Sequence, residues 1–252
     1  MSLLTLARDL KRRKGRERRS LFVAEGARAV EELLKSGISV RGVLVTPEFL
    51  ESTRGAALQA LIVDRRLTLE QVGERDLATA ADTDTPQGVV AVAETPEHQL
   101  SSIPLAGVAR IVVLDGIQDP GNAGTIVRSA AALGAKGVVA LPGTVDLWNP
   151  KVVRGAMGAH FSYPLVHATQ QELFDFLAGE SVALWGAAGD GEAIGSGQAP
   201  ERLAIAFGNE GAGLTAAVRE RCDALVSIPI EPMVESLNVA VAAGIVLHEL
   251  RG

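Results

Sequence analysis

Two polar side chains stand at the start of an apolar helix in the C-terminal stretch of the chain, residues 228–250. Ser236 and Asn238 open a run in which almost every side chain is apolar, and a helix that is apolar all round is normally buried. In one interpretation, Ser236 caps the helix and Asn238 is a solvated residue of its first turn. In the other, both side chains face a small ligand that binds where the buried helix begins.

A second polar set lies in residues 119–135, DPGNAGTIVRSAAALGA. Asn122, Thr125 and Arg128 recur at every third position, which predicts one polar flank of a helix whose other flank is apolar. Taken alone, the pattern describes an asparagine-capped helix that carries a solvated arginine. Its value as a site depends on what the rest of the chain places beside it.

A third set lies in residues 207–215, FGNEGAGLT. The glycines leave room where only a backbone can approach a ligand, and Glu210 stands where the next helix is expected to start. Taken alone, this is a tight turn with a carboxylate favoured by the helix dipole.

The elements that must position these residues alternate between strands and helices. Apolar runs at residues 111–114, 203–207 and 224–228 precede the three polar sets. Near-continuous apolar strands are typical of a parallel sheet covered on both faces, so we expect an α/β domain. Because ligands bind at the carboxyl ends of such strands, the three loops are expected to form one site.

The N-terminal part of the chain predicts a second, smaller α/β domain. Apolar runs at residues 21–23, 42–45 and 88–93 alternate with helical patterns. A short strand at 61–63 and a helix at 69–77 are also expected. Proline and serine gather after this part, so we divide the chain into an N-terminal domain at 1–97, a linker at 98–107 and a C-terminal domain at 108–252.

Composition limits the class of protein. The 252 residues are 47% hydrophobic, and no apolar run reaches the ~18 residues expected of a membrane span. The single cysteine, Cys222, excludes an internal disulfide and fits a reducing compartment. These features predict a soluble cytoplasmic protein.

Basic charge is concentrated near the N-terminus although the net charge is −6. Residues 8–19 hold 8 of the 24 basic residues. Such a cluster is either an electrostatic footprint for phosphates or a solvated, partly disordered tail, and charge alone leaves both open. Aromatic content of 4% argues against base stacking as the main mode of RNA binding.

Other nucleotide and metal motifs are missing from the sequence. It has no GxxxxGK[ST] phosphate loop, and Ile194 stands where a dinucleotide fingerprint beginning at Gly189 needs its third glycine. Four scattered histidines and one cysteine form no zinc-ligand spacing, so no metal is expected. An NAD-binding α/β protein is therefore disfavoured.

Four segments together are far more specific than each alone. NAGTIVRSAAALGA, LWNPKVVRGAMGAHF, IAFGNEGAGLT and IPIEPMVESLNVAVAAG, in this order, resemble the SpoU/TrmH family of RNA 2′-O-ribose methyltransferases within the SPOUT superfamily. FVAEGARAVEELL and TPQGVVAV resemble the substrate-binding domain of the members that act on rRNA. One departure is Glu231-Pro232, where many relatives have a glycine.

The resemblance implies a fold, a cofactor and a set of site residues. The fold is a parallel sheet whose C-terminal segment threads a loop as a deep trefoil knot, preceded by the RNA-binding domain. The cofactor is S-adenosyl-L-methionine, and the enzyme is a homodimer that acts on RNA without a metal or a membrane. By position, the cofactor residues are Gly208, Ile228, Pro229 and Leu237. The catalytic residues are Asn122, Arg128, Glu210, Ser236 and Asn238.

Arg128 is treated in the family as the residue that activates the ribose 2′-hydroxyl. A guanidinium does not give up its proton in proteins, so we expect an electrostatic clamp on the phosphate and the developing alkoxide. Glu210 is expected to orient Arg128 or the ribose. The most favoured substrate is large-subunit rRNA; the alternatives are tRNA or a non-catalytic role in RNA binding or ribosome assembly.

Overall fold

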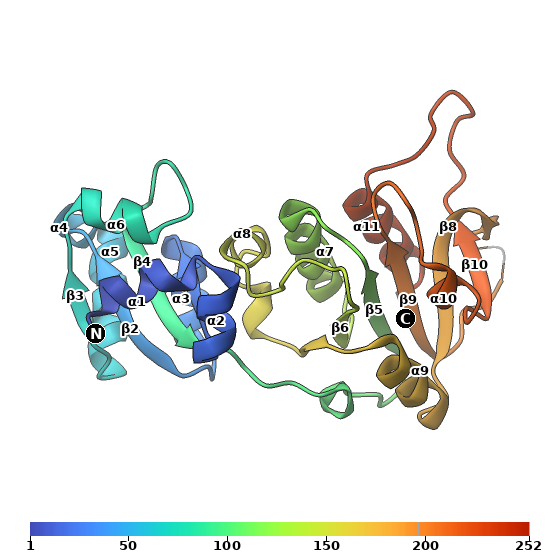
Figure 1. Cartoon of the computed structure of the whole chain (residues 1–252), viewed down its shortest axis with the longest axis horizontal. Coiled ribbons are helices and arrows are strands. Elements are labelled where there is room, and N and C mark those ends of the chain that lie inside the picture. The colour runs from blue at the N-terminus through green and yellow to red at the C-terminus, as the bar shows by residue number, and fades with distance from the viewer. Residues whose placement is uncertain (196, 252) are drawn as a thin grey trace. The chain divides into compact units, whose positions relative to one another are not determined.

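The computed structural model describes residues 1–195 and 197–251, and it divides into two compact units (Figure 1). The first unit is Met1–Pro96 together with Trp148–Ser162, and the second holds Glu97–Leu147 and the chain from Tyr163 onward. A segment from the middle of the chain is therefore part of the N-terminal unit. A boundary drawn along the sequence cannot express this exchange, and the division at 97 and 108 stays a prediction.

The first unit is built on a four-stranded mixed sheet of order β1-β4-β2-β3. The strands are β1 (Leu21–Glu25), β2 (Val40–Val45), β3 (Leu69–Gln71) and β4 (Val89–Glu94). Its helices are α1 (Leu3–Leu10), α2 (Arg13–Arg19), α3 (Ala27–Lys35), α4 (Pro47–Glu51), α5 (Thr53–Asp64), α6 (Glu74–Ala80) and α8 (Pro150–Gly155), with a 3-10 turn at Ala159–Phe161. Side chains of α1, α6 and β4 share one buried cluster.

Two predictions of secondary structure in this unit are wrong, the strand at 61–63 and the helix at 69–77. Residues 61–63 belong to α5, and residues 69–77 divide into β3 and α6. Short apolar runs do not distinguish a strand from a buried helix turn by pattern alone. Ile62 is 1% exposed on the inner side of α5, whereas Leu69 pairs in parallel with Val43 of β2.

The second unit confirms the predicted α/β class. Its six strands are all paired in parallel in the order β10-β8-β9-β5-β6-β7. They are β5 (Ala109–Asp115), β6 (Gly137–Ala140), β7 (Leu165–His167), β8 (Ala183–Ala193), β9 (Arg202–Gly208) and β10 (Ala224–Ser227). Every residue of β5 is buried, as expected for a central strand covered on both faces.

Helices cover this sheet. They are α7 (Pro120–Ala132), α9 (Gln170–Gly179), α10 (Ala216–Arg219) and α11 (Val239–Glu249), with a 3-10 turn at Leu100–Ser102. Leu173 of α9 and Val218 of α10 lie in one cluster with Ile111 and Val113 of β5. Ile103, from the expected linker, is 4% exposed in the same cluster, so this stretch packs against the second unit.

The C-terminal helix returns from the edge of the sheet to its middle. After edge strand β10, the chain forms a long loop and then α11, which packs against α7 (Figure 1). Such a return is what a threaded C-terminus needs, and the knot itself stays a prediction. The expectation that α11 is buried all round is wrong, because Val241 is 52% exposed. Among the described residues, no helix has both the length and the apolar character to cross a membrane.

Candidate active site

A hydrogen-bonded chain of three side chains joins the three polar loops. The Asn122 side-chain amide donates to Glu210 Oε1 at 3.0 Å, and the Asn238 amide donates to Asn122 Oδ1 at 2.9 Å. The three residues follow β5, β9 and β10, whose carboxyl ends lie at one edge of a parallel sheet. The sheet therefore brings together groups that are far apart in the sequence.

Asn122 is free for this network because another residue caps its helix. Asp119 is the N-cap of α7 and accepts from the Asn122 backbone N–H at 2.7 Å, while Pro120 takes the first helical position. The expectation of an asparagine cap at 122 is wrong by three residues. The side-chain amide of Asn122 is consequently left to reach across to Glu210 and Asn238.

Glu210 faces the start of α7 and not the start of its own next helix. The loop that carries it is closed by paired backbone hydrogen bonds of 2.9 Å between Asn209 and Gly213, and α10 begins only at Ala216. Besides Asn122, the backbone N–H groups of Gln118 and Asp119 donate to the carboxylate, at 3.3 and 3.2 Å. Burial opposes its ionisation, but these hydrogen bonds outweigh burial and hold the pKa of Glu210 below its ordinary value.

Asn238, not Ser236, is the N-cap of the C-terminal helix. Its side-chain oxygen accepts from the backbone N–H groups of Ala240 and Val241, at 2.9 and 3.3 Å. Ser236 is exposed and forms no hydrogen bond with the described residues. The first interpretation of this stretch is thus wrong about which residue caps, and Asn238 both caps α11 and reaches Asn122.

Arg128 stays apart from the network. It is exposed on α7, and within residues 1–195 and 197–251 it has neither an ion pair nor a hydrogen bond. The expected contact from Glu210 to Arg128 is not formed, because the Glu210 carboxylate is directed to Asn122 and the start of α7. The structure joins three of the five catalytic candidates and leaves Arg128 and Ser236 open to solvent.

The four cofactor candidates surround the same edge. Gly208 ends β9, and a Cβ atom there would lie 2.2 Å from Gly213 C and Leu214 N. Glycine at 208 therefore makes room for the backbone of the protein's own loop. The sequence instead predicts that this glycine makes room for a ligand. Ile228 and Leu237 are half-buried and Pro229 is exposed, at the two ends of the loop between β10 and α11. Partly exposed apolar side chains beside a glycine turn fit an adenine ring that needs apolar cover.

Comparison with known proteins places the chain in a family. Residues 109–248, more than half of the chain, match the family model described as SpoU rRNA Methylase family. The chain belongs to the SpoU rRNA methylase family. Residues 5–91 match the MRM3-like substrate binding domain, so both predicted resemblances are confirmed.

Relatives of known function and structure cover nearly the whole chain. The 23S rRNA (guanosine(2553)-2′-O)-methyltransferase RlmP of Bacillus subtilis is 35% identical over 97% of this chain and 94% of its own length. The 23S rRNA (uridine(2479)-2′-O)-methyltransferase of Streptomyces viridochromogenes is 32% identical over 94% of this chain and 84% of its own length. A crystal structure of the SpoU methyltransferase AviRb from the same organism, with the cofactor AdoMet, has a TM-score of 0.88 and 30% identity, covering 99% of this chain and 97% of AviRb.

Sequence reasoning missed two residues that seat the Glu210 loop of this SpoU chain. Asp115, fully buried at the end of β5, accepts from the Thr215 backbone N–H at 2.7 Å. Asn209 donates to the Gly116 backbone oxygen at 2.9 Å. A carboxylate directly after the apolar run at 111–114 is a usable signal for Asp115, because such a group is rarely buried without a partner.

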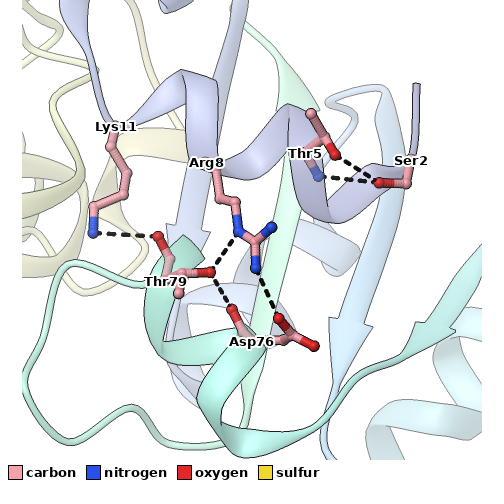
Figure 2. Close-up of polar contacts among 6 residues, drawn as sticks. All are labelled: Ser2, Thr5, Arg8, Lys11, Asp76 and Thr79. Atoms are coloured by element: carbon pink, nitrogen blue, oxygen red, sulfur yellow. Dashed lines mark hydrogen bonds and ion pairs between the residues drawn. The ribbon is translucent and has the colours of Figure 1, made fainter.

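The basic cluster is folded and largely engaged within the first unit. Figure 2 shows Arg8 donating to Asp76 Oδ1 at 2.8 Å and to Thr79 Oγ1 at 2.5 Å, while Lys11 reaches the Thr79 backbone oxygen at 3.4 Å. Arg18 and Arg19 both pair with Asp9. The alternative of a disordered tail is wrong, since these residues form α1 and α2.

Proposed function

We propose that this chain transfers a methyl group from S-adenosylmethionine to the 2′-hydroxyl of a ribose in large-subunit rRNA. The observation that carries the proposal is the Glu210–Asn122–Asn238 chain at the carboxyl edge of a SpoU sheet. Relatives that match nearly the full length are named as 23S rRNA 2′-O-methyltransferases. Because their names give different nucleotides, the modified position of this chain does not follow from them.

The network works as a positioning device. The Glu210 oxygens accept from Asn122, Gln118 and Asp119, and the low pKa keeps the carboxylate ionised at neutral pH. A lowered pKa makes it a weaker base than an ordinary carboxylate, and its oxygens are already engaged by three donors, so we assign it an orienting role. Its hydrogen bond fixes the amide plane of Asn122, and through it Asn238, which leaves defined polar groups to orient the ribose.

Arg128 supplies positive charge where the reaction develops negative charge. S-adenosylmethionine, when bound, supplies a methyl group on a positively charged sulfur. The unpaired guanidinium of Arg128 would contact the phosphate beside the target ribose and stabilise the 2′-oxygen as that oxygen loses its proton to solvent and takes the methyl group, with the sulfur leaving as a neutral thioether. Ile228 and Leu237 would hold the adenine of the bound cofactor and exclude water from it.

A second copy of the chain completes the site. The groove between α7 and α11, of about 530 Å³, is lined by Thr125, Ser129, Val241, Ile245 and His248. Val241 is 52% exposed there, and Ser129 is the neighbour of Arg128. A dimer through this face would cover the exposed apolar side of α11 and place partner residues next to Arg128.

The test is methyl transfer with labelled S-adenosylmethionine to 23S rRNA transcripts and to total tRNA. Label on 23S rRNA at a ribose, located by the resistance of one linkage to alkaline hydrolysis, is the expected outcome. Label on tRNA alone would show that tRNA, and not rRNA, is the substrate. Absence of transfer to either, with the cofactor still bound in calorimetry, would favour the non-catalytic role.

A further inference from the structure

A cavity of about 610 Å³ is lined only by residues of the first unit, and none of the candidate active site residues lines it. Its lining comes from the end of β2, from α4, from α6 and from residues 84–88. This volume is within the ~300–1,000 Å³ that is typical of small-molecule sites. No role described above uses it.

The lining of the cavity includes apolar side chains that a ring could contact. Phe49 and Pro86 line it together with Leu77 of α6. Gly88 has φ +78°, and a Cβ atom there would lie 2.7 Å from the Phe49 Cβ. Glycine at 88 is therefore what lets Phe49 take this place, and any larger residue would displace it.

The polar part of the lining is rich in acceptors. Glu48, Glu74 and Asp84 line it, all exposed, and none forms an ion pair or hydrogen bond with the described residues. The only cation in the lining is Arg75, which is also unpaired among those residues. The cavity thus offers carboxylates to a ligand edge that donates hydrogen bonds, and one guanidinium to an anion.

The α6 wall is fixed from outside by the basic helix α1. Asp76 and Thr79 of α6 hold Arg8 and Lys11 (Figure 2). Three other residues of the same helix, Glu74, Leu77 and Ala78, line the cavity. Part of the basic cluster therefore serves to hold a cavity wall and is not free for phosphates. A wall held in advance lowers the entropy that binding has to remove.

We propose that this cavity holds one unpaired nucleobase of the RNA substrate that bears an exocyclic amino group: adenine, guanine or cytosine. The base stacks on Phe49, its amino edge donates to the carboxylates, and Arg75 takes the adjoining phosphate. Uracil fits poorly, because its two carbonyl oxygens would face carboxylates. The inference rests on the proposed function for the class of ligand, and residues 5–91, which match a substrate binding domain, contain the whole lining.

Binding of the full chain to a 23S rRNA transcript, measured at fixed salt, tests the cavity. Phe49→Ala is expected to weaken binding roughly 5- to 100-fold, the effect of losing one stacked base. Glu48→Gln together with Glu74→Gln is expected to weaken binding several-fold. The sign is decisive, because removing negative charge without a base in the cavity would tighten binding to a polyanion. Glu51→Gln, on the same helix as Glu48 but outside the lining, is the matched control and should stay within twofold.

Chemical probing of the same transcript identifies the base. Dimethyl sulfate reports unpaired adenine and cytosine, and kethoxal reports unpaired guanine. We expect one base to be protected by the wild-type chain and to react again with saturating Phe49→Ala, while other protections persist. Thermal unfolding and cofactor affinity should match wild type. Should Phe49→Ala destabilise the fold, the paired glutamine variants carry the test.

Two outcomes would overturn the inference. One is an unchanged dissociation constant for Phe49→Ala with an unchanged pattern of protection, which a basic peptide as occupant also predicts. The other is tighter binding by the glutamine variants. Methyl transfer by the wild-type chain is measured separately. If the wild-type chain is active but Phe49→Ala binds RNA unchanged, only the proposal for the cavity is rejected. Specific protection without methyl transfer would reject only the proposed function.

Discussion

Arg154 and Arg128 both lie in the stretch that matches the SpoU family, but their guanidinium groups have opposite surroundings. Arg154 lies 3.5 Å from Glu25, whose side chain is 3% exposed, and 3.4 Å from Asp82. Arg128 is exposed and has no such partner in the described part of the chain. A cation paired with a buried carboxylate leaves little charge for a ligand to meet, whereas an exposed unpaired cation is available to an anion. From this contrast we predict that Arg154 serves stability and that Arg128 serves chemistry.

The two glutamates differ in the same way. Glu25 accepts from the backbone N–H of Asp82 at 2.8 Å and from the Thr83 hydroxyl, and Arg154 compensates its charge. Glu210 accepts only from amides and is exposed. The Glu25 carboxylate is buried and its charge is compensated by a cation. The Glu210 carboxylate is exposed and orients the Asn122 side chain.

Replacing Arg128 should produce the largest effect on catalysis. Arg128→Ala is expected to lower kcat by roughly 10²- to 10³-fold, the typical loss when one donor to a developing oxyanion is removed. Stability should stay within about 0.5 kcal/mol, because no partner is lost. Single-turnover methyl transfer and urea unfolding measure the two quantities. Arg128→Lys keeps the charge, and near-full turnover of that variant would show that guanidinium geometry is not required.

Replacing Arg154 should lower the stability of the fold and leave turnover unchanged. Arg154→Met leaves the Glu25 carboxylate buried without its cation, and we expect a loss of about 2 kcal/mol in the free energy of unfolding. This is below the full value for a buried pair, because the Arg154 side chain is 36% exposed. Turnover per folded molecule should be retained. If Arg154→Met unfolds like wild type in urea but loses turnover, the division between the two arginines is wrong.

The sheet and the meeting of its loops could be predicted from the sequence, because both follow from local patterns. In the second unit the apolar runs at 111–114, 203–207 and 224–228 fall on β5, β9 and β10, and parallel strands bring their carboxyl ends to one edge whatever their order. The helix start at Pro120 was also readable, since Asp119-Pro120 is a cap followed by a favoured first residue. Choosing Asn122 as the cap overlooked that pair.

Specific pairings across long separations could not be predicted. Nothing local indicates that Glu210 binds Asn122 and not Arg128, because both are polar residues of one helix. The placement of Trp148–Ser162 in the first unit depends on the Trp148 ring, 4.5 Å from that of Phe22, and on the ion pair of Arg154. Such contacts depend on tertiary packing, which a pattern along the chain does not encode.

Glu210 should show its lowered pKa in the pH dependence of stability. A carboxyl whose pKa is lower in the folded state than its ordinary 4.5 stabilises the fold above that value, and the contribution disappears as the pH falls through the lowered pKa. Glu210→Gln should therefore melt roughly a few degrees below wild type at pH 7, and the gap should close in acid. Turnover at pH 7 should fall on the order of tenfold, because Asn122 loses its fixed orientation. A gap of constant size from neutral pH down to about pH 3 would show that the charge of Glu210 does not hold the network.

Unpaired and paired cations of the first unit should contribute differently to the salt dependence of RNA binding. We expect this effect to be measurable but smaller than the preceding ones. Arg12 and Lys14 have no partner among the described residues, whereas Arg41 pairs with Glu94 at 2.7 Å. Each phosphate contact contributes about one unit to the slope of log affinity against log salt. The double variant Arg12→Ala, Lys14→Ala should lower that slope by about 2 and weaken binding at moderate salt. Arg41→Ala should leave the slope unchanged; an equal effect of both would mean that pairing does not decide which cations meet phosphate, and the contrast drawn between Arg154 and Arg128 would lose its generality.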